Sequence, residues 1–211
     1  MDANPSVLII DDDAEFRESV GRLLRTIGLE SQQFSCVSDY LSADPAPDGP
    51  TCLVVDVRMP GRSGLDLQRE LSAAHRKLPM IFITAHGDIP MTVRAMKEGA
   101  LEFLTKPFRD QDLLDAIMTG LARDRARREG EKSLESLRQR FDTLSPRERE
   151  IMIQATAGRL NKQIANDVGI AESTVKVHRT NLMRKMKARS LPELSRMVDA
   201  LGLPQESPQP S

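Results

Sequence analysis

The first 120 residues alternate between short apolar runs and longer stretches with helical periodicity. A short apolar run between polar or turn-forming residues is typical of a buried strand. We therefore expect five strands, at VLII (7–10), the weaker ESQQF (30–34), CLVV (52–55), MIFIT (80–84) and LEFL (101–104).

Apolar residues recur at helical spacing between these runs, in segments 14–28, 64–74 and 90–98, as Phe16 and Val20 illustrate. Strands and helices that alternate in this way form a parallel sheet with helices on both faces. The expected fold class of this part is α/β, with a five-stranded, doubly wound parallel sheet. Ligands of such sheets bind at the carboxyl ends of the strands.

The pattern becomes purely helical from about residue 110. In the charged stretch that follows, the spacing of Leu134, Leu137 and Phe141 can place them on one helix face. We expect a helical linker here, with a loose coil around Gly130 as the alternative.

A second, all-α domain of four helices is expected after the linker. Ser145 can cap its first helix, Pro146 suits the first helical position and Glu148 completes a capping box. The expected division is a first domain 1–121, a linker 122–142, a second domain 143–202 and a Pro/Ser-rich, disordered tail 203–211.

Charge is distributed unevenly along the chain, although the net charge is only −1. Residues 1–120 contain 12 Lys/Arg and 19 Asp/Glu, a net charge of −7, whereas residues 121–211 contain 18 and 12, a net charge of +6. A basic C-terminal part favours an acidic partner such as DNA.

Composition also excludes several classes of protein. The longest apolar runs fall far short of the ~20 residues of a membrane-spanning helix, and the acidic start lacks the basic region of a signal peptide. We therefore expect a cytoplasmic protein with no membrane role. Cys36 and Cys52 have no metal-binding spacing and are expected to be small buried apolar residues.

Candidate chemistry lies at the ends of four expected strands. Asp11 and Asp12 follow the first strand, Asp56 the third, Thr84 the fourth and Lys106 the fifth. A carboxylate that attacks a phosphoryl group is repelled by its charge, and a hard divalent cation with oxygen ligands relieves this repulsion, which fits Mg²⁺. A Lys can neutralise the remaining charge, and a Thr hydroxyl can hydrogen-bond to a phosphoryl oxygen.

Four segments resemble the motifs of response-regulator receivers, in order and in spacing: LIIDDD (8–13), VVDVRMPGRSGLDL (54–67), FITAHGD (82–88) and GALEFLTKPF (99–108). The resemblance implies a flavodoxin-like fold in which Asp56 is the nucleophile and phosphoacceptor, assisted by Thr84 and Lys106. It also implies that Asp12 and Asp56 bind Mg²⁺ directly and that Asp11 is an outer-shell ligand.

The same resemblance assigns further positions. It implies that the backbone carbonyl of Arg58 is another metal ligand, that Thr84 and Phe103 form a switch, and that the peptide before Pro107 is cis. Two residues have a second interpretation without a role in the switch or the site. Phe103 is equally plausible as an ordinary core residue, and Asp13 is equally plausible as a helix cap alone.

Residues 161–180 have the pattern of a helix-turn-helix. Ala165, Gly169 and Val175 stand where this motif needs a small residue, a flexible turn and a buried apolar anchor. The stretch 173–189 contains six basic residues and no acidic one, which suits a helix in the major groove between phosphates. A generic solvated basic face is the alternative.

Three segments, LSPREREI (144–151), NKQIA (161–165) and STVKVHRTNLMRKM (173–186), resemble the LuxR-type output domain, and the whole chain resembles the NarL/FixJ class, with FixJ-like members closest. The resemblance makes Lys176, His178 and Arg179 the groove-facing residues and Thr174, Asn181 and Lys185 phosphate contacts. Leu160, Ile164, Val168, Leu182 and Met186 are expected to be core.

One position departs from the family pattern. Ala171 stands where the family commonly has Ser, and Ala is a poorer helix cap by about 1 kcal/mol. The helix is therefore expected to start nearer Ser173 or to rely on tertiary support.

These features predict a DNA-binding transcriptional response regulator rather than an enzyme. The implied partners are a sensor histidine kinase, double-stranded DNA at an operator or promoter, a second copy that pairs through residues 88–109 on phosphorylation, and RNA polymerase. Phosphorylation is expected to promote dimerisation, unmasking of the DNA-binding helix, or both. The rivals are a Mg²⁺-dependent phosphatase or phosphotransferase with Asp56 as turnover nucleophile, and a DNA-binding protein with a decayed receiver.

Overall fold

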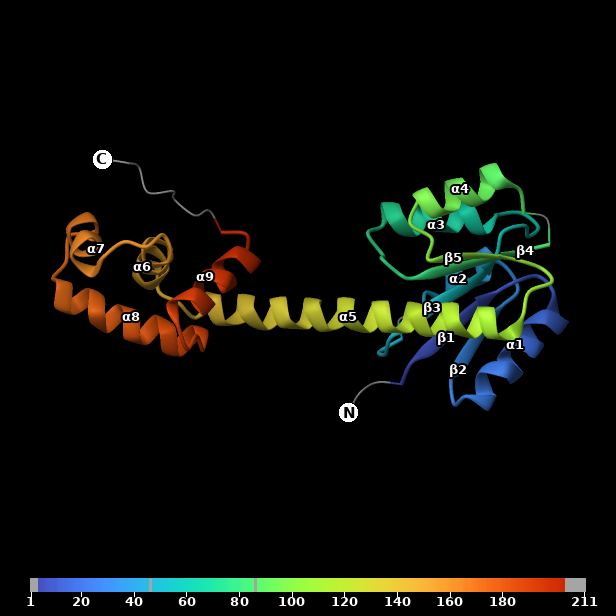
Figure 1. Ribbon diagram of the computed structural model, residues 1–211, viewed down its shortest axis with the longest axis horizontal. Helices are drawn as coiled ribbons and strands as arrows, with labels where there is room; N and C mark the ends of the chain where they lie inside the picture. The colour runs from blue at the N-terminus through green and yellow to red at the C-terminus, as the bar shows by residue number, and fades with distance from the viewer. Residues whose placement is uncertain (1–3, 46, 86, 204–211) are drawn as a thin grey trace. The chain divides into compact units, whose positions relative to one another are not determined.

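The chain forms two compact units, Met1–Arg128 and Glu129–Ser211, in a computed structural model that describes residues 4–45, 47–85 and 87–203 (Figure 1). The division falls inside the segment 122–142 that was expected to be a linker. Apart from Leu203, the tail that was expected to be disordered lies outside the described residues.

Five parallel strands form one sheet in the first unit, in the order β2-β1-β3-β4-β5. Each strand that the sequence predicted is present, although the last begins at Glu102 rather than Leu101 and the third extends to Asp56. The strands are β1 (Ser6–Ile10), β2 (Glu30–Phe34), β3 (Thr51–Asp56), β4 (Met80–Thr84) and β5 (Glu102–Thr105).

Helices follow each strand of this unit: α1 (Ala14–Thr26), α2 (Val37–Ala43), α3 (Gly64–Ala73), α4 (Ile89–Lys97) and α5 (Asp110–Asp142). α2 was not predicted from the sequence, although Val37, Tyr40 and Leu41 have helical spacing. Cys36 is the N-cap of this helix and its sulfur accepts the Asp39 N–H, so the expectation that it is a buried apolar residue was wrong. Cys52 is buried, as expected.

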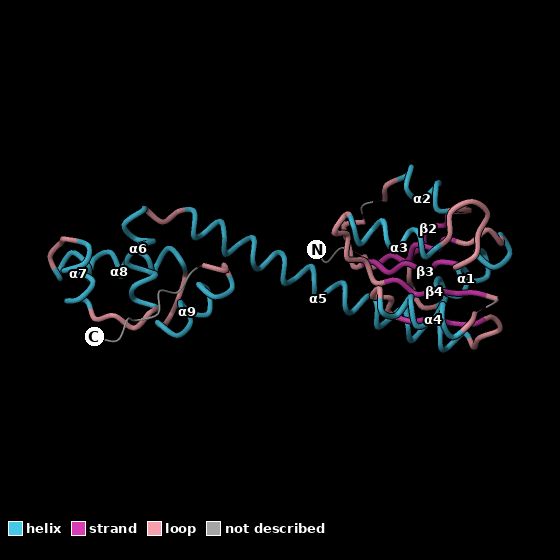
Figure 2. The backbone as a smooth tube through the Cα atoms, turned by 90° about the horizontal axis from the view of Figure 1, so that it is seen from above, coloured by secondary structure: helices cyan, strands magenta, loops and turns pink. Residues whose placement is uncertain are grey.

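Alternate strand residues face two separate cores. Leu8 and Phe82 belong to the core that packs against α2, α3 and α4, whereas Val7 and Ile81 belong to the core that packs against α1 and α5. Figure 1 shows α3 and α4 on one side of the strands and α1 on the other, and Figure 2 shows that the strands, in magenta, all lie in the first unit. The expected doubly wound α/β fold is confirmed.

One uninterrupted helix, α5, continues from the first unit into the second. Its first turns place Leu113 and Ile117 in the core of the first unit, and its last turns place Leu137 and Phe141 in or against the core of the second. Gly130 is helical, so there is no coil at this position. Within the described residues, no helix combines the length and the apolar character that a membrane span requires.

Four helices complete the second unit: α6 (Pro146–Thr156), α7 (Asn161–Val168), α8 (Glu172–Met186) and α9 (Leu191–Ala200). The predicted capping box of Ser145 and Glu148 begins α6. Leu160 was wrongly assigned to the core, because it stands at the cap of α7 with 69% of its surface exposed. The other four expected core residues, Ile164, Val168, Leu182 and Met186, are buried.

Candidate functional site

Three carboxylates meet at the carboxyl edge of the sheet. Asp11 and Asp12 follow β1, Asp56 is the last residue of β3, and one oxygen of each lies within 4.8 Å of the others. The ends of β1 and β3 coincide because these strands pair in parallel. Gly64 lets α3 start close to this edge, since a Cβ there would lie 2.5 Å from the Asp56 carbonyl oxygen.

Lys106 is the cation that faces this cluster. Its Nζ donates a hydrogen bond to Asp11 Oδ2 at 2.9 Å and lies 3.8 Å from Asp56 Oδ2. The Phe16 ring lies below the ammonium group, with its centroid 3.8 Å away. The cis peptide that the resemblance implied after Lys106, before Pro107, is present.

Burial raises the pKa of Asp56 above its ordinary value. The backbone N–H of Arg58, 3.0 Å from Oδ1, and the Lys106 charge act in the opposite direction, whereas Asp11 and Asp12 raise the pKa further. Carboxylate oxygens gathered in this way are the hard ligands that Mg²⁺ prefers, so these residues fit a divalent cation.

Thr84 and Phe103 lie near each other, close to the edge of the sheet that carries the acidic cluster. Thr84 ends β4 and is 1% exposed, and the partly buried Phe103 ring packs against Phe82 with centroids 6.3 Å apart. Both border Gly87, where a Cβ would lie 3.2 Å from Thr84 Cγ2 and 3.1 Å from Phe103 Cε1. The two residues of the expected switch therefore lie next to the same glycine.

Asp13 is a helix cap, as expected. Its carboxylate accepts the N–H groups of Glu15 and Phe16 and so caps α1. Its own N–H donates to Asp11 Oδ1 at 2.9 Å, which helps to hold that buried carboxylate in place.

The turn between α7 and α8 has the geometry of a helix-turn-helix. Ala165 and Val175 are buried, and Gly169 adopts a φ of +67° between the two helices. α8 starts immediately after Ala171 and has no side-chain cap, so its start has not shifted to Ser173. The hydrogen bond from the Ile170 N–H to the Ala165 carbonyl closes the end of α7, and the buried Val175 side chain gives the first turn of α8 tertiary support.

Part of the basic surface of α8 is open to solvent. The side chain of Lys176 is 63% exposed beside Glu172, Thr174 is exposed, and His178 and Asn181 are partly exposed. Val177 is an apolar residue with 60% exposure that was not predicted from the sequence as part of this surface. Its position two residues after the buried Val175 was the available signal, because that spacing points away from the core.

Two expected DNA contacts, Arg179 and Lys185, also bind partners within the domain. Arg179 Nη1 donates to Asn161 Oδ1 at 2.6 Å. Lys185 Nζ donates to Glu148 Oε2 at 2.6 Å and to the Thr143 carbonyl at 3.1 Å. Burial would raise the pKa of Glu148, but its hydrogen bonds with Lys185 and the α6 cap outweigh burial and lower it.

Comparison with known proteins identifies the two units. Residues 7–118 match the response regulator receiver domain family, and residues 142–198 match the luxR family of bacterial regulatory proteins. The chain belongs to the response regulators. It is a member of their NarL/FixJ class, with a receiver domain and a LuxR-type output domain.

Similar proteins agree with this assignment along most of the chain. Nodulation protein W of Bradyrhizobium diazoefficiens is 50% identical over 93% of this response regulator and 86% of its own length. Transcriptional regulatory protein FixJ of Azorhizobium caulinodans is 43% identical over 93% of each chain. The solved structure of the response regulator StyR is 49% identical, with a TM-score of 0.84 over 93% of this chain and 99% of that one.

The pair of Lys185 and Glu148 leads to a prediction about the output domain. Lys185→Ala should lower its free energy of unfolding by about 1.5–3 kcal/mol, because Glu148 stays buried without its charged partner. Glu148→Gln should also destabilise, and the double variant should lose less than the sum of the two single losses. Calorimetry of the full chain measures these changes.

The stabilisation by the pair of Lys185 and Glu148 should decrease as the pH falls. Because folding lowers the pKa of Glu148, its contribution is complete above the ordinary glutamate pKa of about 4.3 and is lost as the pH falls through the lower, folded value. The advantage of wild type over Glu148→Gln should therefore shrink in acid. Lys162→Ala, at an exposed lysine, is the control. A Lys185→Ala variant as stable as this control would contradict the assigned role.

Proposed function

We propose that this response regulator accepts a phosphoryl group from a sensor histidine kinase on Asp56 and then regulates transcription by binding DNA through α8. The observation that supports this most directly is the position of Asp56, with 12% side-chain exposure, between two further carboxylates and Lys106 in a chain that also carries a helix-turn-helix. Asp56 is then the acceptor of a regulatory group and not the nucleophile of a turnover enzyme. The DNA target places this function in the cytoplasm.

Each residue of the cluster has a part in the transfer. One Asp56 oxygen forms a bond to phosphorus while the bond from phosphorus to the kinase's histidine nitrogen breaks, and the electron pair leaves with the imidazole. Lys106 neutralises charge on the new phosphoryl group, and the Thr84 hydroxyl donates a hydrogen bond to one of its oxygens. Asp11, Asp12, Asp56 and the Arg58 carbonyl would hold Mg²⁺, which offsets negative charge when it is bound.

Replacement of the acceptor tests this proposal. Asp56→Asn should form no phosphoryl adduct with acetyl phosphate and Mg²⁺, because the amide is not a nucleophile, whereas wild type and the exposed Asp115→Asn control should each gain one. Mass spectrometry of the intact chain measures the adduct. Steady release of phosphate from varied esters by wild type would indicate an enzyme, and a wild type without an adduct would indicate a decayed receiver.

We propose Lys176 and His178 as the groove-facing residues, with Thr174 and Asn181 next to DNA phosphates. These four are at least partly exposed on α8. We propose Arg179 as a third groove-facing residue and Lys185 as a further phosphate contact, each with donors beyond those that bind Asn161 and Glu148.

Substitution on α8 tests the DNA interface. Lys176→Ala should weaken binding to an operator selected from random DNA, and it should lower the salt slope by about one unit if the lost contact is to a phosphate. Lys77→Ala, an exposed lysine of the receiver domain, should leave both quantities unchanged. Titration at several salt concentrations measures them, and equal binding by the two variants would contradict the assignment of α8.

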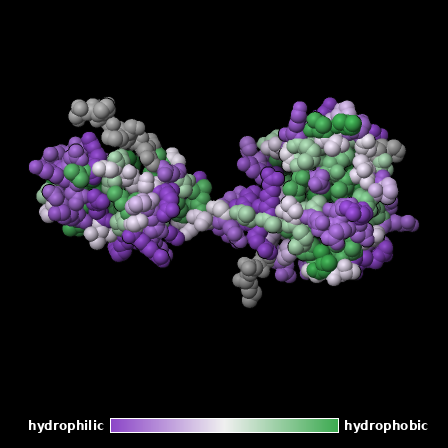
Figure 3. All heavy atoms as spheres, in the orientation of Figure 1, coloured by the Kyte–Doolittle hydropathy of each residue, from purple (hydrophilic) through white to green (hydrophobic). Residues whose placement is uncertain are grey.

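Phosphorylation is proposed to act through the surface built from residues 88–109. Ile89, Val93 and Met96 of α4 are 81%, 45% and 41% exposed, and apolar surface is visible over α4 in Figure 3. A shift of Thr84 toward the phosphoryl group and of the Phe103 ring behind it would prepare this surface to pair with a second copy. Paired receivers raise the effective concentration of two output domains at adjacent half-sites, where they would recruit RNA polymerase.

Mass and affinity measured together separate dimerisation from unmasking of α8. With beryllofluoride, a phosphoryl mimic, the full chain should become a dimer by light scattering and bind its operator more tightly. Val93→Asp should prevent both changes, whereas Ile27→Asp, at an exposed isoleucine after α1, should not. A rise in affinity while the free and the DNA-bound protein stay monomeric would exclude the dimer route and favour unmasking.

A further inference from the structure

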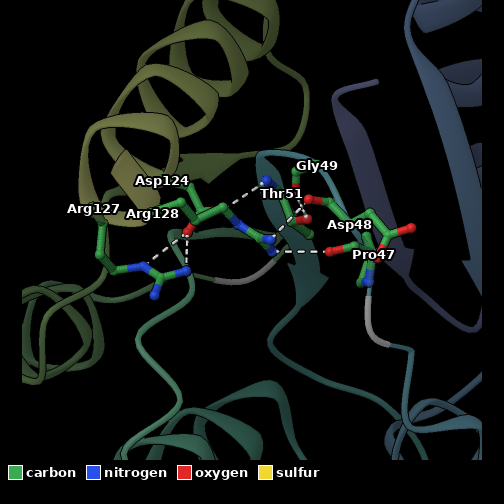
Figure 4. Close-up of polar contacts among 7 residues, drawn as sticks. All are labelled: Pro47, Asp48, Gly49, Thr51, Asp124, Arg127 and Arg128. Carbon is green, nitrogen blue, oxygen red and sulfur yellow. Dashed lines mark hydrogen bonds and ion pairs between the residues drawn. The ribbon is translucent and has the colours of Figure 1, made fainter. Parts of the chain in front are cut away.

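α5 carries a buried ion-pair network just beyond residue 118, where the match to the receiver family ends. At its centre is Asp124, whose carboxylate is fully buried. Oδ1 accepts hydrogen bonds from Nε and Nη2 of Arg127 at 2.9 and 2.6 Å. Oδ2 accepts from Nε of Arg128 at 2.7 Å and from the backbone N–H of Thr51 at 2.9 Å (Figure 4).

The network extends from α5 to the segment that leads into β3. Arg128 Nη1 donates to the Asp48 carbonyl at 3.2 Å, and its Nη2 donates to the Pro47 carbonyl at 3.1 Å. The Thr51 hydroxyl donates to the Gly49 carbonyl at 2.9 Å, so this segment is itself ordered around the network (Figure 4). The Asp124 carboxylate and Arg128 therefore fasten α5 to backbone groups at the start of β3.

Close packing accompanies these bonds. A Cβ at Gly120 would lie 2.6 Å from Cys52 Sγ, so α5 lies directly against β3 one turn before Asp124. Burial and the Asp124 charge raise the pKa of Cys52 to about 12. A carboxylate in such surroundings is tolerated only when its oxygens are fully hydrogen-bonded, as those of Asp124 are.

The network determines how much of α5 is without tertiary contacts to either domain. Leu121 is the last apolar residue of α5 in the receiver core, and Leu137 is the first in the output core. Without the network, the whole stretch 122–136 would be solvated and would stay helical only by propagation from the two cores. With it, the receiver holds α5 as far as Arg128, and only residues 129–136 depend on helix propagation from their two ends.

We infer that Asp124 is a positioning residue for the phosphorylation switch: it acts through Arg127, Arg128 and Thr51 to fasten the start of the linker helix to the receiver, so that a change in the receiver is transmitted along a folded helix. This inference rests on the proposed function. If the network only stabilises the receiver, its loss will lower the melting temperature and leave the response to phosphorylation intact.

Two full-length variants test the inference. Asp124→Asn keeps the size of the side chain but places an amide donor where Arg and backbone N–H groups already donate. Arg128→Lys keeps the charge but cannot reach Asp124 and the two loop carbonyls together. The matched controls are Asp115→Asn and Arg125→Ala, which change exposed residues of the same helix.

Two measurements are made on each variant, with Asp56 phosphorylation as the check that the receiver is folded. Hydrogen exchange should become about tenfold faster in peptides from 122–133 of both variants and stay unchanged in the controls. The gain in operator affinity on adding beryllofluoride should fall by at least about fivefold, while affinity without beryllofluoride is unchanged.

The anchoring role of Asp124, its role in the switch and the proposed function can each be contradicted by a different result. Unchanged exchange in 122–133 in a folded variant would overturn the anchoring role of Asp124. Faster exchange with an undiminished affinity gain would overturn its role in the switch. A wild type that gains no affinity would contradict the proposed function itself, and the inference with it. If Asp124→Asn fails to fold, the milder Arg128→Lys is judged by the same criteria.

Discussion

The receiver domain depends on keeping three carboxylates together at one edge of a sheet. Their mutual repulsion would separate them in a flexible chain, but the paired ends of β1 and β3 fix the positions of Asp11 and Asp56. β5 then brings Lys106 to the same edge, where its ammonium offsets part of the repulsion. The parallel order of the strands is thus the precondition for this chemistry, because it brings residues from distant parts of the chain to one point.

The residues at this edge of the sheet could be predicted from the sequence, because strand periodicity and strand ends are local signals. Partners that only folding brings close could not be predicted: Arg179 meets Asn161 from 18 residues away, and Lys185 meets Glu148 from 37. Asp124 is the clearest case, since it stands in a run of charged residues that favours a solvated helix and yet is fully buried. Local pattern carries no information about which members of such a run face a neighbouring strand.

Short elements and turns account for the remaining errors. α2 has only seven residues, too few for a helical period to stand out, and its cap is a sulfur rather than a typical capping oxygen. Leu160 is apolar but stands at the N-cap of α7 in an extended conformation, where its side chain is exposed. In both cases the position of a helix end decided the outcome, and the apolar pattern of the sequence does not give that position.

The anchoring of α5 also bears on how such regulators can be recombined. A chimera joined just after residue 118, where the match to the receiver family ends, would separate Asp124 from its receiver-side partner Thr51 and leave the buried charge network of the chimera incomplete. A junction within 129–136 would leave that network and the output core whole, because this stretch contributes to neither. For protein engineering, the natural border of the receiver therefore lies after Arg128, nearly three helical turns beyond residue 118, where the match to its sequence family ends.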